Sequence, residues 1–153
     1  MLLAIDTATR IAGIALYDQD GLHVEQTWRT NDNHTVELMP HIVRACEQQR
    51  LTPSALRGVG VSLGPGSFTG LRVGLSLAKG LALTLNIPLL GVSTLDATAY
   101  AHSREILPVC AVLMAGRGRW CAAVYQTIGG DWQRRTDYLL MNINDLILSL
   151  IHI

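Results

Sequence analysis

The sequence predicts an α/β protein: a lobe with a mixed sheet of five strands and flanking helices, followed by an incomplete second lobe. Three observations predict it. Apolar runs of strand length come first as an antiparallel meander and then alternate with helical segments, as parallel strands joined by crossover helices do. The 153 residues are 49% hydrophobic and 16% charged, which suits a substantial core. The strand pattern begins again near residue 108, as expected for a repeated lobe.

The meander is expected within the first thirty residues. Residues 2–7 and 11–17 are apolar runs joined by a short turn, a pattern typical of a hairpin. Residues 21–30 alternate well enough between apolar and polar side chains to predict a third strand. Two further strands, over 57–63 and 87–92, complete the five that the sheet requires.

Two helices are expected to be apolar over more of their surface than one core contact needs. The first spans 34–49, with Asp32 or Asn33 as its N-cap and a kink at Pro40, and its apolar stripe is unusually wide. The second spans 69–85 and has almost no polar face. A helix that is apolar all round must be covered on both sides, so both helices are candidates for contact with a partner.

The chain is expected to divide into two domains, at 1–103 and 104–153. A helix over about 93–103 should end the first. The second should contain a hairpin, a strand near 136–141 and a helix over 142–153, whose apolar end indicates a lobe that is cut short. Such a repeat is typical of the actin-like, sugar-kinase fold, in which two related lobes face a cleft.

Composition excludes several classes of protein. Acidic and basic residues balance at 12 each and the arginines are scattered, which argues against a nucleic-acid groove built by this chain alone. The three cysteines lie far apart without a C-x-x-C, so neither a disulfide framework nor a zinc site is indicated. No signal peptide and no apolar run long enough to span a bilayer is recognised, and we expect a cytoplasmic protein.

The glycine-rich loop SLGPGSFTGLRVG, residues 62–74, has two interpretations. As an anion site, it would use the amides of a helix N-terminus, close backbone approach at Gly64 and Gly66, and the hydroxyls of Ser67 and Thr69. As a packing turn, Ser67 or Thr69 caps the helix. The lysine of G-x-x-x-x-G-K-[ST] is missing. Small residues that permit close helix packing then recur at every fourth position and favour the turn: Gly70, Gly74 and Ala78.

Two other sets of polar residues also have both a functional and a structural interpretation. Asp6 and Thr7 end the first strand, where the actin-like fold has its first phosphate loop, but Asp6 is equally suited to bond turn amides. His34, Glu37 and His41 are spaced to approach one helix face, as metal ligands do. Without an H-E-x-x-H, surface polar residues are the favoured interpretation of that set.

Four motifs follow one another over residues 1–103: LAIDTAT, HTVELMP, SLGPGSFTGLRVGLSLAKGLA and GVSTLDA. In this order and at these intervals they closely resemble the bacterial TsaB family, also called YeaZ and, in an older label, glycoprotease-like M22 peptidases. The resemblance implies a non-catalytic subunit, of actin-like fold, in the machinery that makes threonylcarbamoyladenosine at tRNA position 37. It further implies a TsaD-like catalytic paralogue as partner, a TsaE-like ATPase in the assembly, homodimers, tRNA contact only through the complex, and no membrane.

The resemblance also places the sites. The first two helices would form the partner interface, which here maps to Leu38, Ile42, Gly70, Leu71, Gly74, Leu75 and Ala78. A weak nucleotide site, for ATP or ADP with Mg²⁺ at that interface, would use Asp6, Thr7, Gly64, Gly66, Ser67 and Thr69. No catalytic residue or metal site is assigned, because the chain lacks the H-x-x-x-H pair of the catalytic paralogue. The alternatives are a nucleotide-binding enzyme of the actin-like fold and, from His34, Glu37 and His41 alone, a metallopeptidase.

The sequence departs from the family in two respects. Many members have a stretch like D-A-R-x-G-E after the first lobe, where this chain has Met114, Ala115, Gly116, Arg117, Gly118 and Arg119. A role for that acid and arginine is therefore not expected here. Family members are also usually longer, which agrees with a second lobe that is cut short.

Overall fold

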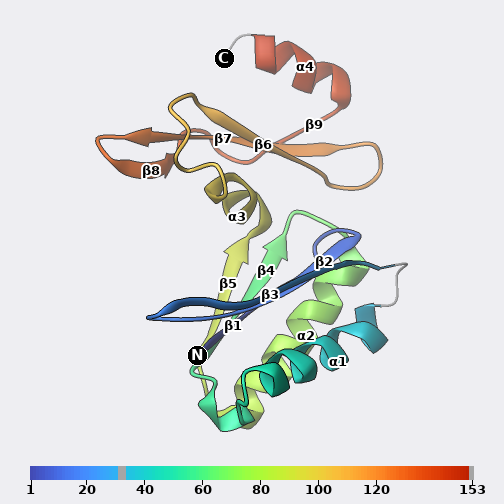
Figure 1. Cartoon of the computed structure of the whole chain (residues 1–153). Helices are drawn as coiled ribbons and strands as arrows, with labels where there is room; N and C mark the ends of the chain where they lie inside the picture. Colours follow the sequence, from blue (N-terminus) through green and yellow to red (C-terminus); the bar gives the residue numbers. More distant parts are fainter. Residues whose placement is uncertain (31–33, 152–153) are drawn as a thin grey trace. The chain divides into compact units, whose positions relative to one another are not determined.

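The computed structural model describes residues 1–30 and 34–151, which form two compact units (Figure 1). Unit 1 comprises Met1–Leu63 and Ser67–Val92, and unit 2 comprises Gly64–Gly66 and Ser93–Ile153. By spatial contact the chain therefore passes into unit 2 at Ser93, eleven residues before the expected start of the second domain, which stays a prediction. The expected N-caps Asp32 and Asn33 lie outside the described residues.

Unit 1 contains the mixed five-stranded sheet that the sequence predicts, in the order β3-β2-β1-β4-β5. β1 pairs antiparallel with β2, β2 pairs antiparallel with β3, and β1 pairs parallel with β4. Alternation in β1 buries Leu3 and Ile5 and leaves Leu2 exposed, so one face of the sheet belongs to the core. The strands are β1 (Leu2–Asp6), β2 (Ile11–Asp18), β3 (Gly21–Arg29), β4 (Gly58–Gly64) and β5 (Leu89–Ser93).

Helices α1 (His34–Gln48) and α2 (Phe68–Leu85) cover that face (Figure 1). Leu38 and Ile42 of α1 enter the same apolar cluster as Leu3 and Ile5. α1 continues through Pro40 as a single helix. Ser67 caps α2, accepting a hydrogen bond from Gly70 N at 3.2 Å, and Asn86 ends it in the left-handed conformation with φ 52°.

Small residues bring α2 close to the sheet. Gly70, Gly74, Ala78 and Ala82 are the buried residues of this helix and follow one another at intervals of four. The fully buried Thr7 hydroxyl, at the end of β1, donates a hydrogen bond to Gly70 O at 2.8 Å. The ridge that the sequence predicts for helix packing therefore faces the sheet of its own unit.

Unit 2 contains a second sheet, in the order β6-β7-β8, with β9 also paired to β7. Gly129 and Gly130 both have positive φ and form the turn of a β7–β8 hairpin, so β8 is a strand that the sequence analysis did not predict. The expected strand at 136–141 is shorter, at 139–141. The elements are α3 (Thr94–Tyr100), β6 (Val109–Met114), β7 (Trp120–Ile128), β8 (Asp131–Arg134), β9 (Leu139–Met141) and α4 (Ile143–Ile151).

The expectation that no apolar run is long enough to cross a bilayer is wrong for α2 on length and composition. Its 18 residues have a mean hydropathy of 1.2. The core helix of a globular protein passes the same test, and the buried small-residue ridge of α2 packs on the sheet.

Candidate partner-binding surface on α1 and α2

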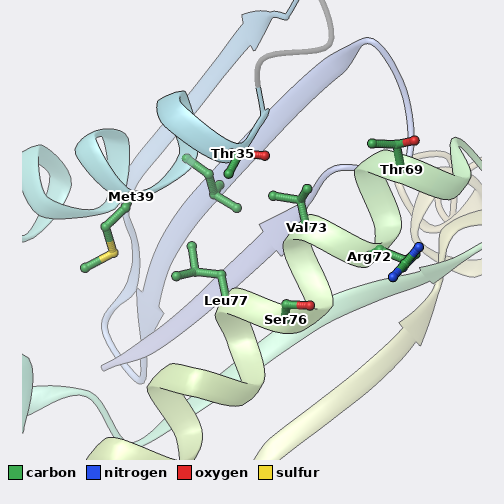
Figure 2. A pocket seen from close by; sticks show the side chains of 8 residues that line it. Thr35, Met39, Thr69, Arg72, Val73, Ser76 and Leu77 are labelled. Carbon is green, nitrogen blue, oxygen red and sulfur yellow. The ribbon is translucent and has the colours of Figure 1, made fainter.

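A groove of about 540 Å³ runs between α1 and α2 (Figure 2). In this view Met39 and Leu77 lie toward one end and Thr69 and Arg72 toward the other, so the groove is apolar at one end and polar at the other. The two helices contact each other, and each also packs on the sheet, α1 against β2 and α2 against β1. The lining residues are Thr35, Leu38, Met39, Thr69, Arg72, Val73, Ser76 and Leu77.

Both helices leave large apolar side chains in solvent. Val36, Met39 and Val43 of α1 are 70%, 40% and 41% exposed, and Phe68 and Leu83 of α2 are 73% and 82% exposed. The core is already supplied by the opposite sides of these helices. The exposed apolar residues are therefore surplus to folding and available to bury against another molecule.

Most of the expected interface residues lie in the core of unit 1. Leu38, Ile42 and Ala78 are at most 2% exposed, and the glycines at 70 and 74 are buried against the sheet. Leu71 and Leu75 are half-buried, and Leu75 packs on the same core. The buried members of this set offer a partner little surface, whereas Leu71 and Leu75 keep part of theirs, so most of the accessible surface comes from exposed neighbours on the two helices.

The residues expected at a nucleotide have structural partners in unit 1. Asp6 Oδ1 accepts a hydrogen bond from Ala8 N at 2.9 Å, which is the turn bond that the sequence offered as the alternative. Thr7 is fully buried, and its hydroxyl donates a hydrogen bond to Gly70 O. Ser67 is the helix cap, and Thr69 lies exposed at the groove.

The glycines expected in that nucleotide loop have mixed conformations. Gly64 has φ 108°, a value that side-chain-bearing residues rarely adopt, whereas Gly66 shows no positive φ. The peptide bond between Gly64 and Pro65 is cis. The loop is thus a tight turn before a capped helix, as the packing interpretation requires.

Glu37 and His41 attach α1 to β3. Glu37 Oε2 accepts a hydrogen bond from Trp28 Nε1 at 3.1 Å. The His41 ring stacks on Trp28 with centroids 3.8 Å apart, and its Nδ1 lies 3.1 Å from Gln26 Oε1. The side chain of His34 lies outside the described part of the chain. Within residues 1–30 and 34–151 no three potential metal ligands come together, and these contacts give Glu37 and His41 a packing role instead.

The sequence analysis did not predict a polar cluster around the carboxylate of Asp96 in unit 2. Asp96 Oδ1 accepts hydrogen bonds from Tyr125 at 2.6 Å and Tyr138 at 2.9 Å, and Arg134 Nη1 lies 3.7 Å away. Burial, followed by the hydrogen bond to Asp96, raises the pKa of Tyr125 well above its usual value. The partners are 29 to 42 residues from Asp96 in sequence, so no local motif signals the cluster.

The cysteines are not activated nucleophiles. Burial raises the pKa of the thiols of Cys46, Cys110 and Cys121. A raised pKa keeps a thiol protonated at neutral pH, and only the thiolate attacks or binds metal. No covalent catalysis is therefore expected from these side chains.

Comparisons with known proteins agree with the motifs. The profile of the family described as "TsaD: tRNA N6-adenosine threonylcarbamoyltransferase" matches residues 28–150. The tRNA threonylcarbamoyladenosine biosynthesis protein TsaB of Bacillus subtilis is 36% identical over 84% of this chain and 56% of that protein. TsaB of Escherichia coli is 34% identical over 82% of this chain and 54% of that protein. The chain thus spans about half the length of the curated relatives it matches.

Solved structures give the same result for the fold. YeaZ from Pseudomonas aeruginosa superposes with a TM-score of 0.81 at 26% identity, over 92% of this chain and 66% of that chain. The ethanolamine utilization protein EutJ from Carboxydothermus hydrogenoformans, at 19% identity and a TM-score of 0.51, covers 97% of this chain and 54% of that chain and shares only the fold. The fold is actin-like, and the chain belongs to the TsaB (YeaZ) family.

Proposed function

We propose that this chain is a non-catalytic subunit in the biosynthesis of tRNA threonylcarbamoyladenosine, and that it binds a TsaD-like paralogue through α1 and α2. The names of its relatives support the pathway. In this proposal the protein is cytoplasmic, a TsaE-like ATPase joins the assembly, a homodimer forms when the paralogue is absent, and tRNA is contacted only through the complex.

The observation that carries the proposal is the surplus of exposed apolar side chains beside the groove. Met39 lines the groove, Val36 and Val43 are exposed on the same helix, and Leu83 is exposed on α2. Burying a side chain of this size stabilises a complex by about 1.5–3 kcal/mol before the costs of association. A partner with its own helices would fill the groove by packing ridges against these residues.

The test is the mass of the chain, by light scattering on a sizing column, alone and after mixing with the TsaD-like paralogue of the same organism. We expect a heterodimer with the wild-type chain and its loss with Met39→Glu. Met39 is suitable because it lines the groove and is 40% exposed. Leu75→Glu is a poorer choice, because Leu75 packs on the core and its loss would also unfold unit 1.

The matched control is Ile106→Glu, which adds the same charge at an exposed apolar residue outside both helices. It should leave the heterodimer intact. If Met39→Glu and Ile106→Glu bind the paralogue equally well, or if the wild-type chain ignores the paralogue, the proposal is wrong.

A further inference from the structure

The exposed side of α2 carries two cations that have no ion-pair partner among the described residues. Arg72 and Lys79 are both exposed, and they are seven residues apart. Seven residues make two helical turns, so the two side chains project from one face about 10 Å apart. The ion pairs formed within residues 1–30 and 34–151 join His23 to Asp18 and Arg134 to Asp96, so neither α2 cation is paired.

The contact that Arg72 does make leaves its donors available. Its guanidinium carbon lies over the Phe68 ring, 5.3 Å from the ring centre, which is a cation–π contact. No hydrogen bond or ion pair of this guanidinium is formed within residues 1–30 and 34–151, and its N–H groups match a carboxylate in geometry and charge. Thr69 and Ser76 line the groove on the same helix and add hydroxyl donors beside it.

A second copy of this chain is poorly suited to these cations. The 18 residues of α2 contain no Asp or Glu, so no register of α2 against α2 supplies a carboxylate. In a twofold antiparallel pairing centred between residues 75 and 76, Arg72 would face Lys79 of the second copy twice. Like charges brought together in this way oppose association.

Helix α1 of a second copy supplies little acid. Glu37 already accepts a hydrogen bond from Trp28. Glu47 stands one turn after Arg44 on the exposed side of the helix, so the two charges largely cancel toward a partner. Neither helix therefore presents the pair of free carboxylates that Arg72 and Lys79 could bind.

We propose that Arg72 and Lys79 select the partner. They bind a helix of the TsaD-like paralogue that carries two carboxylates about two turns apart, in preference to a second copy of this chain. The inference rests on the proposed function and adds the chemistry of the partner to it. Apolar contact at Met39 and Leu77 supplies area, whereas Arg72 at the groove and Lys79 two turns along the same helix face decide which helix can bind there.

Charge reversal at Lys79 gives effects of opposite sign on the two assemblies. Lys79→Glu should weaken binding of the paralogue by about tenfold or more, since one attractive pair becomes repulsive. The same change should tighten self-association, because Glu at this position of one copy faces Arg72 of the other in both symmetry-related pairs. Raising NaCl from about 0.05 M to about 0.5 M should weaken the wild-type heterodimer and strengthen the wild-type homodimer.

Dissociation constants for both assemblies are measured by analytical ultracentrifugation with the full chain and the intact paralogue. Arg57→Glu is the control, because Arg57 is exposed and lies outside both helices. It should change neither constant by more than about twofold.

The outcomes separate this inference from the proposed function. Loss of the heterodimer in Met39→Glu but not in Lys79→Glu would overturn the role of the cations and leave the helix interface standing. A Lys79→Glu homodimer no tighter than that of the wild type would likewise contradict selection against a second copy. If the wild-type chain does not bind the paralogue at all, both proposals fall together.

Discussion

Gly74 leaves no room for a side chain between α2 and Thr7, and Gly74→Ala should destabilise unit 1. A Cβ at residue 74 would overlap the Oγ1 atom of Thr7. Thr7 has no exposed surface, is stiff about χ1 as a β-branched residue, and is held by its hydrogen bond to Gly70 O. The helix must move away from β1, or Thr7 must rotate and lose that bond.

The magnitude follows from three contributions. Overpacking in a close-fitting core costs about 1–3 kcal/mol. Loss of the Thr7 hydrogen bond costs about 1 kcal/mol more. The better helix propensity of alanine returns about 1 kcal/mol. The net expectation is a decrease of about 1–3 kcal/mol in the free energy of unfolding of unit 1.

Gly80→Ala is a matched control on the same helix. A Cβ at residue 80 meets nothing within 4 Å, so this variant should gain about 1 kcal/mol from helix propensity alone. Urea unfolding is followed by the fluorescence of Trp28, which lies in unit 1, with the tryptophans at 120 and 132 replaced by phenylalanine. Equal stability of the two glycine variants would refute the close approach of α2 to Thr7.

A double variant checks the cause. In a Thr7→Ala background the Oγ1 atom that obstructs residue 74 is absent. Gly74→Ala should then cost less than in the wild-type background, and the difference between the two costs measures the coupling between residues 7 and 74. Equal costs in both backgrounds would show that the obstacle is not Thr7.

Three further predictions concern local features. Ser67→Ala removes the cap of α2 and should lower the stability of unit 1 by about 1 kcal/mol in the same urea assay, whereas Ser67→Asp retains an acceptor and most of the stability. Arg50→Gly should raise the stability of unit 1 by up to about 1 kcal/mol, because Arg50 has φ 52°, where only glycine is free of strain. Burial and the hydrogen bond to Asp96 raise the pKa of Tyr125 in the folded state. The stability that neutral Tyr125 contributes to unit 2 is therefore complete below pH about 10 and is lost at higher pH. Tyr125→Phe should flatten this alkaline decline in a series of thermal unfolding curves.

Local patterns were sufficient for most of the fold. The alternation of β1 and β2, the crossover order and the cap at Ser67 are properties of short stretches, and they predicted the mixed five-stranded sheet and both of its helices. β8 was not predicted, although paired glycines between two strands, here Gly129 and Gly130, are a hairpin signal. The family was likewise identified from motifs that lie within single segments.

The tertiary structure alone decided which side of each helix is free. The sequence determined that α1 and α2 are too apolar to be exposed to solvent on every side. The spacing of apolar residues does not say which face of each helix packs on the sheet and which stays exposed. Gly70, Gly74 and Ala78 face the sheet because only small residues allow α2 to reach the Thr7 hydroxyl. One side of each helix is buried against the sheet, and the other side remains exposed and available to a partner. Met39, Arg72 and their neighbours form this exposed surface of α1 and α2.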